Sequence, residues 1–184
     1  MMAGPQLVTD IPKRKKPRSG FWDWVATFAA VGLAAFLITT FLAEPIRVDG
    51  RSMRNTLQDG ELMLATKLDY LLGDPGRFDV VICHYPDEGS TRFVKRIVGI
   101  PGDTVAISGG VLYINGEPVR EDYIDFKPNY FLPEETVRQG HYFVLGDNRA
   151  SSMDSHIVGQ LVRSQILGRV RCVLWPPGEV RGVR

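Results

Sequence analysis

Residues 24–57 read WVATFAAVGLAAFLITTFLAEPIRVDGRSMRNTL, and the expected type of structure changes within this stretch. Residues 24–43 carry no charge. A helix of about 20 residues, rising about 1.5 Å per residue, crosses a hydrocarbon core of roughly 30 Å. The run is longer than the apolar region of a signal peptide and lacks the polar face of a buried core helix. We therefore predict one uncleaved transmembrane helix over 21–44.

The flanks of this helix predict its orientation. Residues 13–18 read KRKKPR, whereas the near C-terminal flank offers Glu44 and Arg47. Basic flanks favour the cytoplasmic side of a membrane. We expect 1–20 to be a cytoplasmic tail and 45–184 to be an extracytoplasmic domain of a single-pass protein in the plasma membrane.

Short segments rich in Val, Ile, Phe and Tyr follow Pro45 and predict strands. The Gly109-Gly110 and Asn115-Gly116 pairs predict hairpin loops between them. Many short strands at close spacing indicate a mainly β domain, with an antiparallel sheet coiled into an open barrel or sandwich. Residues 121–140 are expected to form an irregular insert. The predicted strands are 46–48, 62–65, 78–85, 92–100, 104–108, 111–114, 142–145 and 167–175.

Composition limits the classes of function. The 184 residues allow one globular domain beyond the N-terminal part. Lys+Arg number 22 and Asp+Glu 21, so the charge balance gives no case for nucleic-acid binding. Cys83 and Cys172 lack the spacing of a metal site, and we predict no metal and no cofactor. A disulfide between these two cysteines stays open.

Three stretches carry candidate chemistry. Ser52 follows a glycine in a short polar loop, and a serine nucleophile needs a base within hydrogen-bonding reach. Lys95 lies among apolar residues in RFVKRIVGI at 92–100, and a lysine withdrawn from water becomes a competent general base. Residues 146–156 read GDNRASSMDSH, a composition typical of turns. Each stretch alone is more often an ordinary loop or a solvent-facing strand.

Their ordered combination is more specific. An apolar span, SMRNTL at 52–57, RFVKRIVGIPGD at 92–103 and GDNRASSMDS at 146–155 together resemble the motifs of the bacterial type I signal peptidases. The resemblance implies a membrane-bound serine endopeptidase that removes signal peptides from secreted preproteins after an Ala-x-Ala-like site, through an acyl-enzyme. It also implies secretory preproteins, the lipid bilayer and the protein-export translocon as partners.

The resemblance assigns roles to individual residues. Ser52 would be the nucleophile, Lys95 its general base, and Ser152 the serine that orients the lysine. The backbone N–H of Ser52 and a donor near Gly50 would form the oxyanion hole, although some family members carry a serine where this chain has glycine. Shallow apolar pockets for the −1 and −3 residues would be lined by Ile46, Val48, Leu57 and Val94. Structural support would come from an Arg96–Asp147 ion pair and from Asn148, Arg149 and Asp154.

The chain departs from the family pattern at two positions. Asn55 replaces the usual proline, which would alter the rigidity of the turn after Ser52. His156 replaces the usual arginine, so its pairing with Asp154 would weaken or depend on pH. His156 is also an alternative base for Ser52, although we identify no acid at a known spacing to complete a triad. Apolar residues expected to contact lipid are Met53, Phe131 and Leu132.

Two other functions remain open. A self-cleaving repressor protease would share the Ser/Lys pair and the β-rich domain, but the apolar span and the lack of an N-terminal DNA-binding helical domain argue against it. A membrane-anchored β domain that binds peptides without catalysis would retain its function when Ser52 or Lys95 is changed to alanine.

Overall fold

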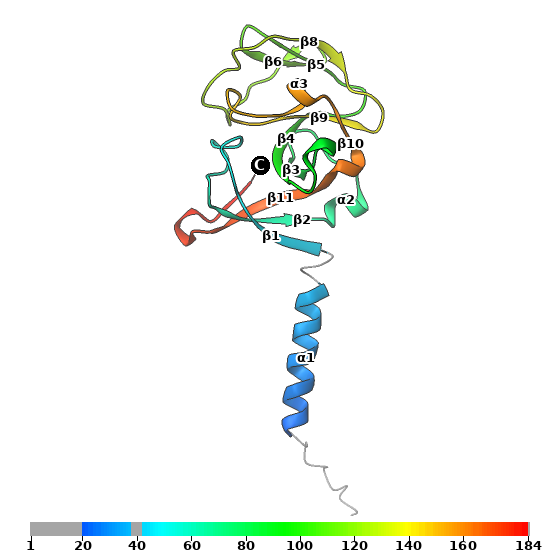
Figure 1. Ribbon diagram of the computed structural model, residues 1–184, viewed down its shortest axis with the longest axis vertical. Coiled ribbons are helices and arrows are strands. Elements are labelled where there is room, and N and C mark those ends of the chain that lie inside the picture. The colour runs from blue at the N-terminus through cyan, green and yellow to red at the C-terminus, as the bar shows by residue number, and fades with distance from the viewer. Residues whose placement is uncertain (1–19, 38–41, 184) are drawn as a thin grey trace, which may run out of the picture. The chain divides into compact units, whose positions relative to one another are not determined.

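The structure is a computed structural model, and it describes residues 20–37 and 42–183 (Figure 1). The described residues fall into two compact units, divided between Phe36 and Leu37. Helix α1 (Phe21–Leu37) lies in the predicted span, whose residues 38–41 fall outside the described part of the chain, as do residues 1–19 of the predicted tail. Within the described ranges, no helix combines the length and apolar character needed to span a bilayer.

The larger β-sheet has eight strands, and every pairing in it is antiparallel. Strand β1 begins at Ala43, so the last two residues of the predicted helix, Ala43 and Glu44, belong to the sheet instead. The strand order is β1 (Ala43–Arg47), β2 (Leu62–Thr66), β11 (Ile166–Trp175), β3 (Val80–Cys83), β4 (Phe93–Gly99), β9 (His141–Leu145) and β10 (Leu161–Val162), with β12 (Arg181–Gly182) paired to β11.

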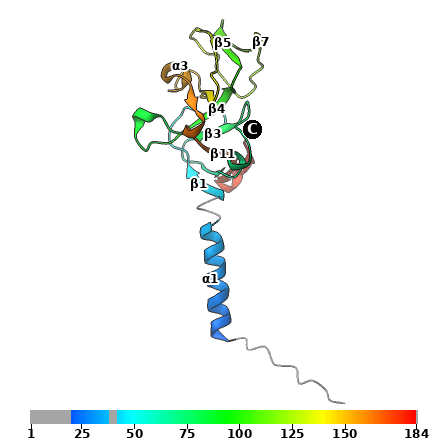
Figure 2. The same ribbon diagram turned by 90° about the vertical axis from the view of Figure 1, so that its right-hand side faces the viewer.

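This sheet is strongly curled (Figures 1 and 2). Strands β1 and β4 are separated by three others, which in a flat sheet would set them about 19 Å apart. Yet Arg92, directly before β4, donates from Nη1 to Glu44 Oε1 on β1 at 2.7 Å. The two strands therefore face each other across a concave surface.

A second antiparallel sheet has the order β7 (Glu117–Pro118), β6 (Val111–Ile114), β5 (Thr104–Ser108) and β8 (Leu132–Thr136). Gly109-Gly110 joins β5 to β6 and Asn115-Gly116 joins β6 to β7. Asn115 and Gly116 have φ values of 54° and 80°, as a two-residue hairpin of type I′ requires. The prediction of a mainly β, antiparallel domain is confirmed.

The prediction of an irregular segment over 121–140 is wrong in its second half. Strand β8 pairs with β5 at the edge of the second sheet. Its sequence, LPEET, contains a proline and two acidic residues, which depress strand propensity. Proline is tolerated on an edge strand because one side of that strand needs no ladder hydrogen bonds.

Both faces of strand β3 are buried. Val80 and Ile82 pack on the concave side of the curled sheet, whereas Val81 and Cys83 pack on the opposite side. Cys83 and Cys172 are both free thiols, so the disulfide left open by the sequence is not formed. The short helical elements are α2 (Asp69–Leu72), η2 (Pro86–Glu88), α3 (Ser155–Val158), η3 (Arg163–Gln165) and η4 (Pro177–Glu179).

Candidate active site

Ser52 precedes a single helical turn that is anchored in the core. The Leu57 N–H donates to the Met53 carbonyl at 2.7 Å, which sets the two side chains on one face of the turn. Met53 is 2% exposed and Leu57 is fully buried, whereas Ser52 is half-buried. The predicted lipid contact of Met53 is therefore wrong, as is that of Leu132, which is 8% exposed. Phe131 is 72% exposed, and its lipid contact stays a prediction.

The loop around Ser52 is held from two directions. The Asn148 N–H donates to the Ser52 carbonyl at 2.9 Å, and the Asn148 side-chain amide donates to the Arg51 carbonyl at 3.0 Å. Asn55 lies against Asp125, donating to its carboxylate at 2.8 Å and accepting from its N–H at 2.6 Å in the amide orientation that pairs both groups. A proline side chain at this position would make neither hydrogen bond. Asn55 therefore lacks the fixed φ of a proline, but it gains two hydrogen bonds to Asp125 in the segment before β8.

Lys95 is 1% exposed on strand β4. Desolvation by burial lowers the pKa of its ammonium, and the negative charge of Asp154 opposes part of that shift. A lysine in this setting carries a neutral amine at a lower pH than an exposed lysine does. Lys95 can therefore act as a proton acceptor.

The candidate residues Ser52, Lys95 and Ser152 all lie close to Gly146. The pairing of β4 with β9 begins at Arg96 opposite Leu145, so continuing the register by one residue sets Lys95 opposite Gly146. A Cβ on Gly146 would lie 2.6 Å from the Ser52 carbonyl oxygen and 2.6 Å from Ser152 Cβ. Only glycine permits this approach. The sequence placed Gly146 in a turn and did not identify this role.

The Ser152 hydroxyl is buried and, among the described residues, has no hydrogen-bond partner. An unpaired buried hydroxyl costs free energy, about 1–3 kcal/mol. In this state it makes no bond to Lys95, so the orienting role of Ser152 stays a prediction.

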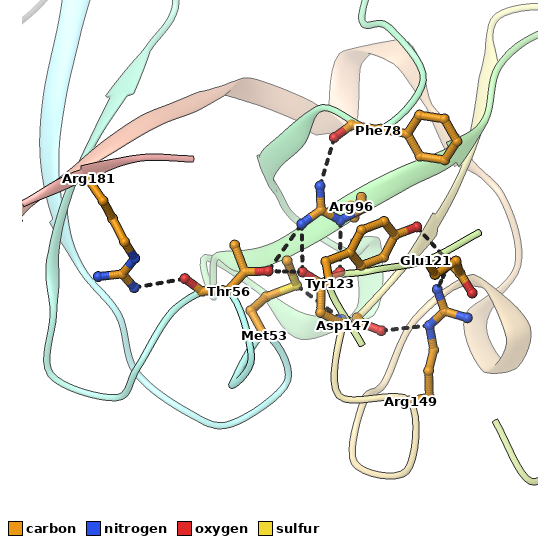
Figure 3. A network of polar contacts seen from close by, with 10 residues as sticks. Met53, Thr56, Phe78, Arg96, Glu121, Tyr123, Asp147, Arg149 and Arg181 are labelled. Carbon is orange, nitrogen blue, oxygen red and sulfur yellow. Dashed lines mark hydrogen bonds and ion pairs between the residues drawn. The ribbon is translucent and has the colours of Figure 1, made fainter. Parts of the chain in front are cut away.

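Arg96 and Asp147 form a bidentate ion pair beside the turn that follows Ser52 (Figure 3). Arg96 Nε and Nη2 lie 2.9 and 2.7 Å from the two carboxylate oxygens of Asp147, and both side chains are 1% exposed. The Thr56 hydroxyl donates to the same carboxylate and accepts from Arg96 Nη2 at 3.1 Å. Arg181 donates to the Thr56 carbonyl at 2.8 Å. The pair is thus joined to the turn that carries Ser52.

Glu121 and Tyr123 complete this network, although the sequence gave them no role. The Tyr123 ring lies 4.0 Å from the Arg96 guanidinium carbon, and the Tyr123 hydroxyl donates to Glu121 at 2.6 Å. Glu121, whose side chain is 4% exposed, also pairs with Arg149, which in turn donates to the Gly146 carbonyl at 3.1 Å. The first part of the predicted insert therefore covers the Arg96–Asp147 pair.

His156 pairs with Asp154, the acidic residue that the sequence named as its partner. Its Nδ1 lies 2.5 Å from Asp154 Oδ1, and its ring stacks on Tyr130 with centroids 4.1 Å apart. The other carboxylate oxygen of Asp154 accepts from the Gly146 N–H at 2.9 Å. His156 is therefore placed to hold Asp154, and it is not among the residues that line the groove at Ser52.

A groove of about 160 Å³ contains Ser52. Of the four predicted pocket residues, Ile46, Val48 and Val94 line it, whereas Leu57 lies in the core and does not. Further apolar lining comes from Met53, Met63, Ile82 and Phe93.

Two backbone edges flank this groove. Among the described strands, β1 pairs only with β2, and residues 93–95 of β4 precede its pairing with β9. Unpaired edges of this kind accept an added peptide strand.

The Gly50 amide is already engaged. Gly50 has φ of +105°, and its N–H donates to Asp59 Oδ1 at 3.0 Å. To contribute to an oxyanion hole, this group would first have to leave Asp59.

An apolar groove with free strand edges, lined in part by a half-buried serine, and a buried lysine on strand β4 together fit a β-rich peptidase. The family model described as "Signal peptidase, peptidase S26" matches residues 21–175. The chain belongs to this family, and it is a serine peptidase.

Two relatives with known names agree with this assignment by their sequences. The chain is 34% identical over 182 residues to a signal peptidase I of Leptolyngbya laminosa, covering 94% of this chain and 89% of that protein. It is 36% identical over 186 residues to a signal peptidase I of Bacillus licheniformis, covering 92% and 96%. A crystal structure of a signal peptidase I from Enterococcus faecalis V583 has 34% identity and a TM-score of 0.46, covering 53% of this chain and 97% of that one.

Proposed function

We propose that the protein removes signal peptides from secretory preproteins by cutting after an Ala-x-Ala-like site, with Ser52 as nucleophile and Lys95 as general base. The observation that supports this proposal is that Ser52, Ser152 and Lys95 all lie around Gly146. Gly146 contacts the Ser52 loop and Ser152, and it lies opposite Lys95 when the β4–β9 register is continued by one residue.

The chemistry follows from these positions. The neutral amine of Lys95 accepts the proton of the Ser52 hydroxyl while its oxygen attacks the scissile carbonyl. The resulting ammonium then donates that proton to the leaving amine, and the acyl group stays on Ser52. Water, activated by the same amine, hydrolyses the acyl-enzyme. The Ser52 N–H stabilises the oxyanion, and Ser152 orients Lys95 through its unpaired hydroxyl.

The substrate would bind as an added strand. A peptide lying between the edge of β1 and residues 93–95 gains main-chain hydrogen bonds, while its alternate side chains enter the groove. Ile46 on β1 and Val48, directly after it, form small apolar walls, which fit the small residues at −1 and −3.

We further propose that residues 21–42 anchor the enzyme in the plasma membrane. Ala43 and Glu44 would then form the start of β1 at the exit of the anchor. Its N-terminus would be cytoplasmic and its peptidase domain would face outward, beside the export translocon. In that position it would meet the end of a signal peptide as it emerges.

The test is cleavage of a purified preprotein by the detergent-solubilised full chain, with sequencing of the new N-terminus. Ser52→Ala and Lys95→Met should abolish cleavage while leaving the fold intact by circular dichroism. Ser151→Ala, at an exposed serine of the neighbouring loop, is the matched control and should cut normally. If Ser52→Ala or Lys95→Met cut as fast as the wild type, the catalytic assignment would be wrong, and a peptide-binding function would replace it.

The pH profile gives a second readout. Because burial lowers the pKa of Lys95 and only the neutral amine accepts a proton, kcat/KM should fall as the pH drops through that pKa. A rate independent of pH from 5 to 9 would exclude Lys95 as the base.

A further inference from the structure

A second cavity, of about 200 Å³, lies beyond the groove at Ser52. Its deeper lining is apolar and includes Ile46, Ile82 and Leu167. Three charged side chains, those of Glu44, Lys67 and Arg92, form its more exposed rim.

The cavity continues the groove. Ile46, Ile82 and Arg92 line both spaces, so the two spaces adjoin each other. The ion pair from Glu44 on β1 to Arg92 before β4 spans the concave face between the two strand edges. A peptide that follows the groove away from Ser52 therefore passes this ion pair.

The spacing along β1 identifies which substrate residue would meet it. Glu44 and Ile46 are alternate residues of β1, and Val48 directly follows the strand with its N–H still bonded to the Glu61 carbonyl at 2.8 Å. The three side chains therefore face the same side about 6.6 Å apart. In an extended peptide alongside β1, the side chains at −1, −3 and −5 have the same spacing. If −1 lies beside Val48 and −3 beside Ile46, then −5 lies beside Glu44.

We infer that this cavity is a third substrate subsite, which receives the side chain five residues before the scissile bond and favours an acceptor such as Glu or Gln over Lys. The inference rests on the proposed function. Glu44 bonds Arg92 at 2.7 Å and Lys67 at 3.4 Å, so two cations and one carboxylate surround the opening. A Glu or Gln side chain of the substrate can accept hydrogen bonds from Arg92 or Lys67. A lysine side chain of the substrate would instead compete with these two residues for the carboxylate of Glu44.

The test uses substrates that differ only at −5, cleaved by the full chain in detergent. Because the rim is partly exposed, the wild type should cleave the Glu substrate about twofold to fivefold faster in kcat/KM than the Lys substrate. The same exchange at −4, where the side chain points away from the cavity, should change kcat/KM little.

Arg92→Glu should reverse the preference at −5. The matched control is Arg171→Ala, because Arg171 is equally exposed at 46% and is also ion-paired, but does not line the cavity. This control should keep the wild-type order. If wild type and Arg92→Glu cut every substrate with the same order of preference, the subsite does not exist. If the wild type cuts none of them, the proposed function itself fails.

Discussion

Gly146→Ala tests the idea that one glycine allows the candidate catalytic residues to converge. The added methyl would lie 2.6 Å from both the Ser52 carbonyl oxygen and Ser152 Cβ. Nonbonded carbon atoms pack at about 3.5–4.0 Å, so one side must retreat by about 1 Å. Gly146 itself cannot move easily, because its N–H is bonded to Asp154 at 2.9 Å and its carbonyl to Arg149 at 3.1 Å.

The expected effects can be separated. Overpacking of this kind typically lowers the free energy of unfolding by about 1–3 kcal/mol. A displacement of about 1 Å at a reacting group can cost about 100-fold in rate. We therefore expect Gly146→Ala to fold with reduced stability and to lose about 100-fold in kcat/KM.

Gly99→Ala is the matched control for crowding. A Cβ there would lie 2.6 Å from Val105 Cγ2 and 2.9 Å from Val137 Cγ2, in the core below the second sheet. It should lose similar stability in urea denaturation yet keep kcat/KM within about twofold when the assay is run well below its transition temperature. If Gly146→Ala also kept kcat/KM within twofold of wild type, the close approach at Gly146 would have no role in catalysis.

Three further changes have defined outcomes. Burial lowers the pKa of Lys95 in the folded state below its value of 10.5 in the unfolded state. The buried charge therefore destabilises the native state by its full amount at any pH below the folded-state pKa. This destabilisation disappears as the pH rises from the folded-state pKa to 10.5. Lys95→Met should therefore unfold at higher urea than wild type at pH 6, with the difference shrinking by pH 10; a constant difference would contradict a buried charge. Asp147→Asn leaves Arg96 buried without its countercharge and should lower the free energy of unfolding by about 3–5 kcal/mol, and a loss below 1 kcal/mol in urea would contradict this. Arg181→Met removes the hydrogen bond to the Thr56 carbonyl and should reduce kcat/KM about tenfold, because the turn after Ser52 becomes less rigid. Unchanged kcat/KM in a preprotein cleavage assay would disprove this effect.

Local chemistry explains which parts of the fold could be predicted. The hairpins at Gly109-Gly110 and Asn115-Gly116 depend on their two loop residues alone, so the sequence was enough to predict them. The strand over 132–136 was missed because Pro133 and its acidic neighbours resemble a loop, and only its edge position makes them acceptable. The predicted helix wrongly included Ala43 and Glu44, because Ala43 continues the apolar composition of the run while already belonging to β1.

The site was predictable only where a motif marked it. Matching motifs pointed to Ser52, Lys95 and the Arg96–Asp147 pair, but no local signal could show that Leu57 packs in the core instead of lining the groove. Burial by distant strands decides that outcome. The role of Tyr123 likewise depends on its contact with Arg96, which no spacing along the chain reveals.

The bonds that fix the turn after Ser52 have a consequence for the order of folding. Thr56 is bonded to Asp147 and Arg181, which are 91 and 125 residues away along the chain, and Arg51 is bonded to Asn148, 97 residues away. Contacts of such separation form late, since the entropy of closing long loops must be overcome first. The enzyme is therefore expected to become active only after nearly all of its domain has been synthesised and folded. A nascent or misfolded copy would lack a formed active site, which protects neighbouring proteins from untimely cleavage.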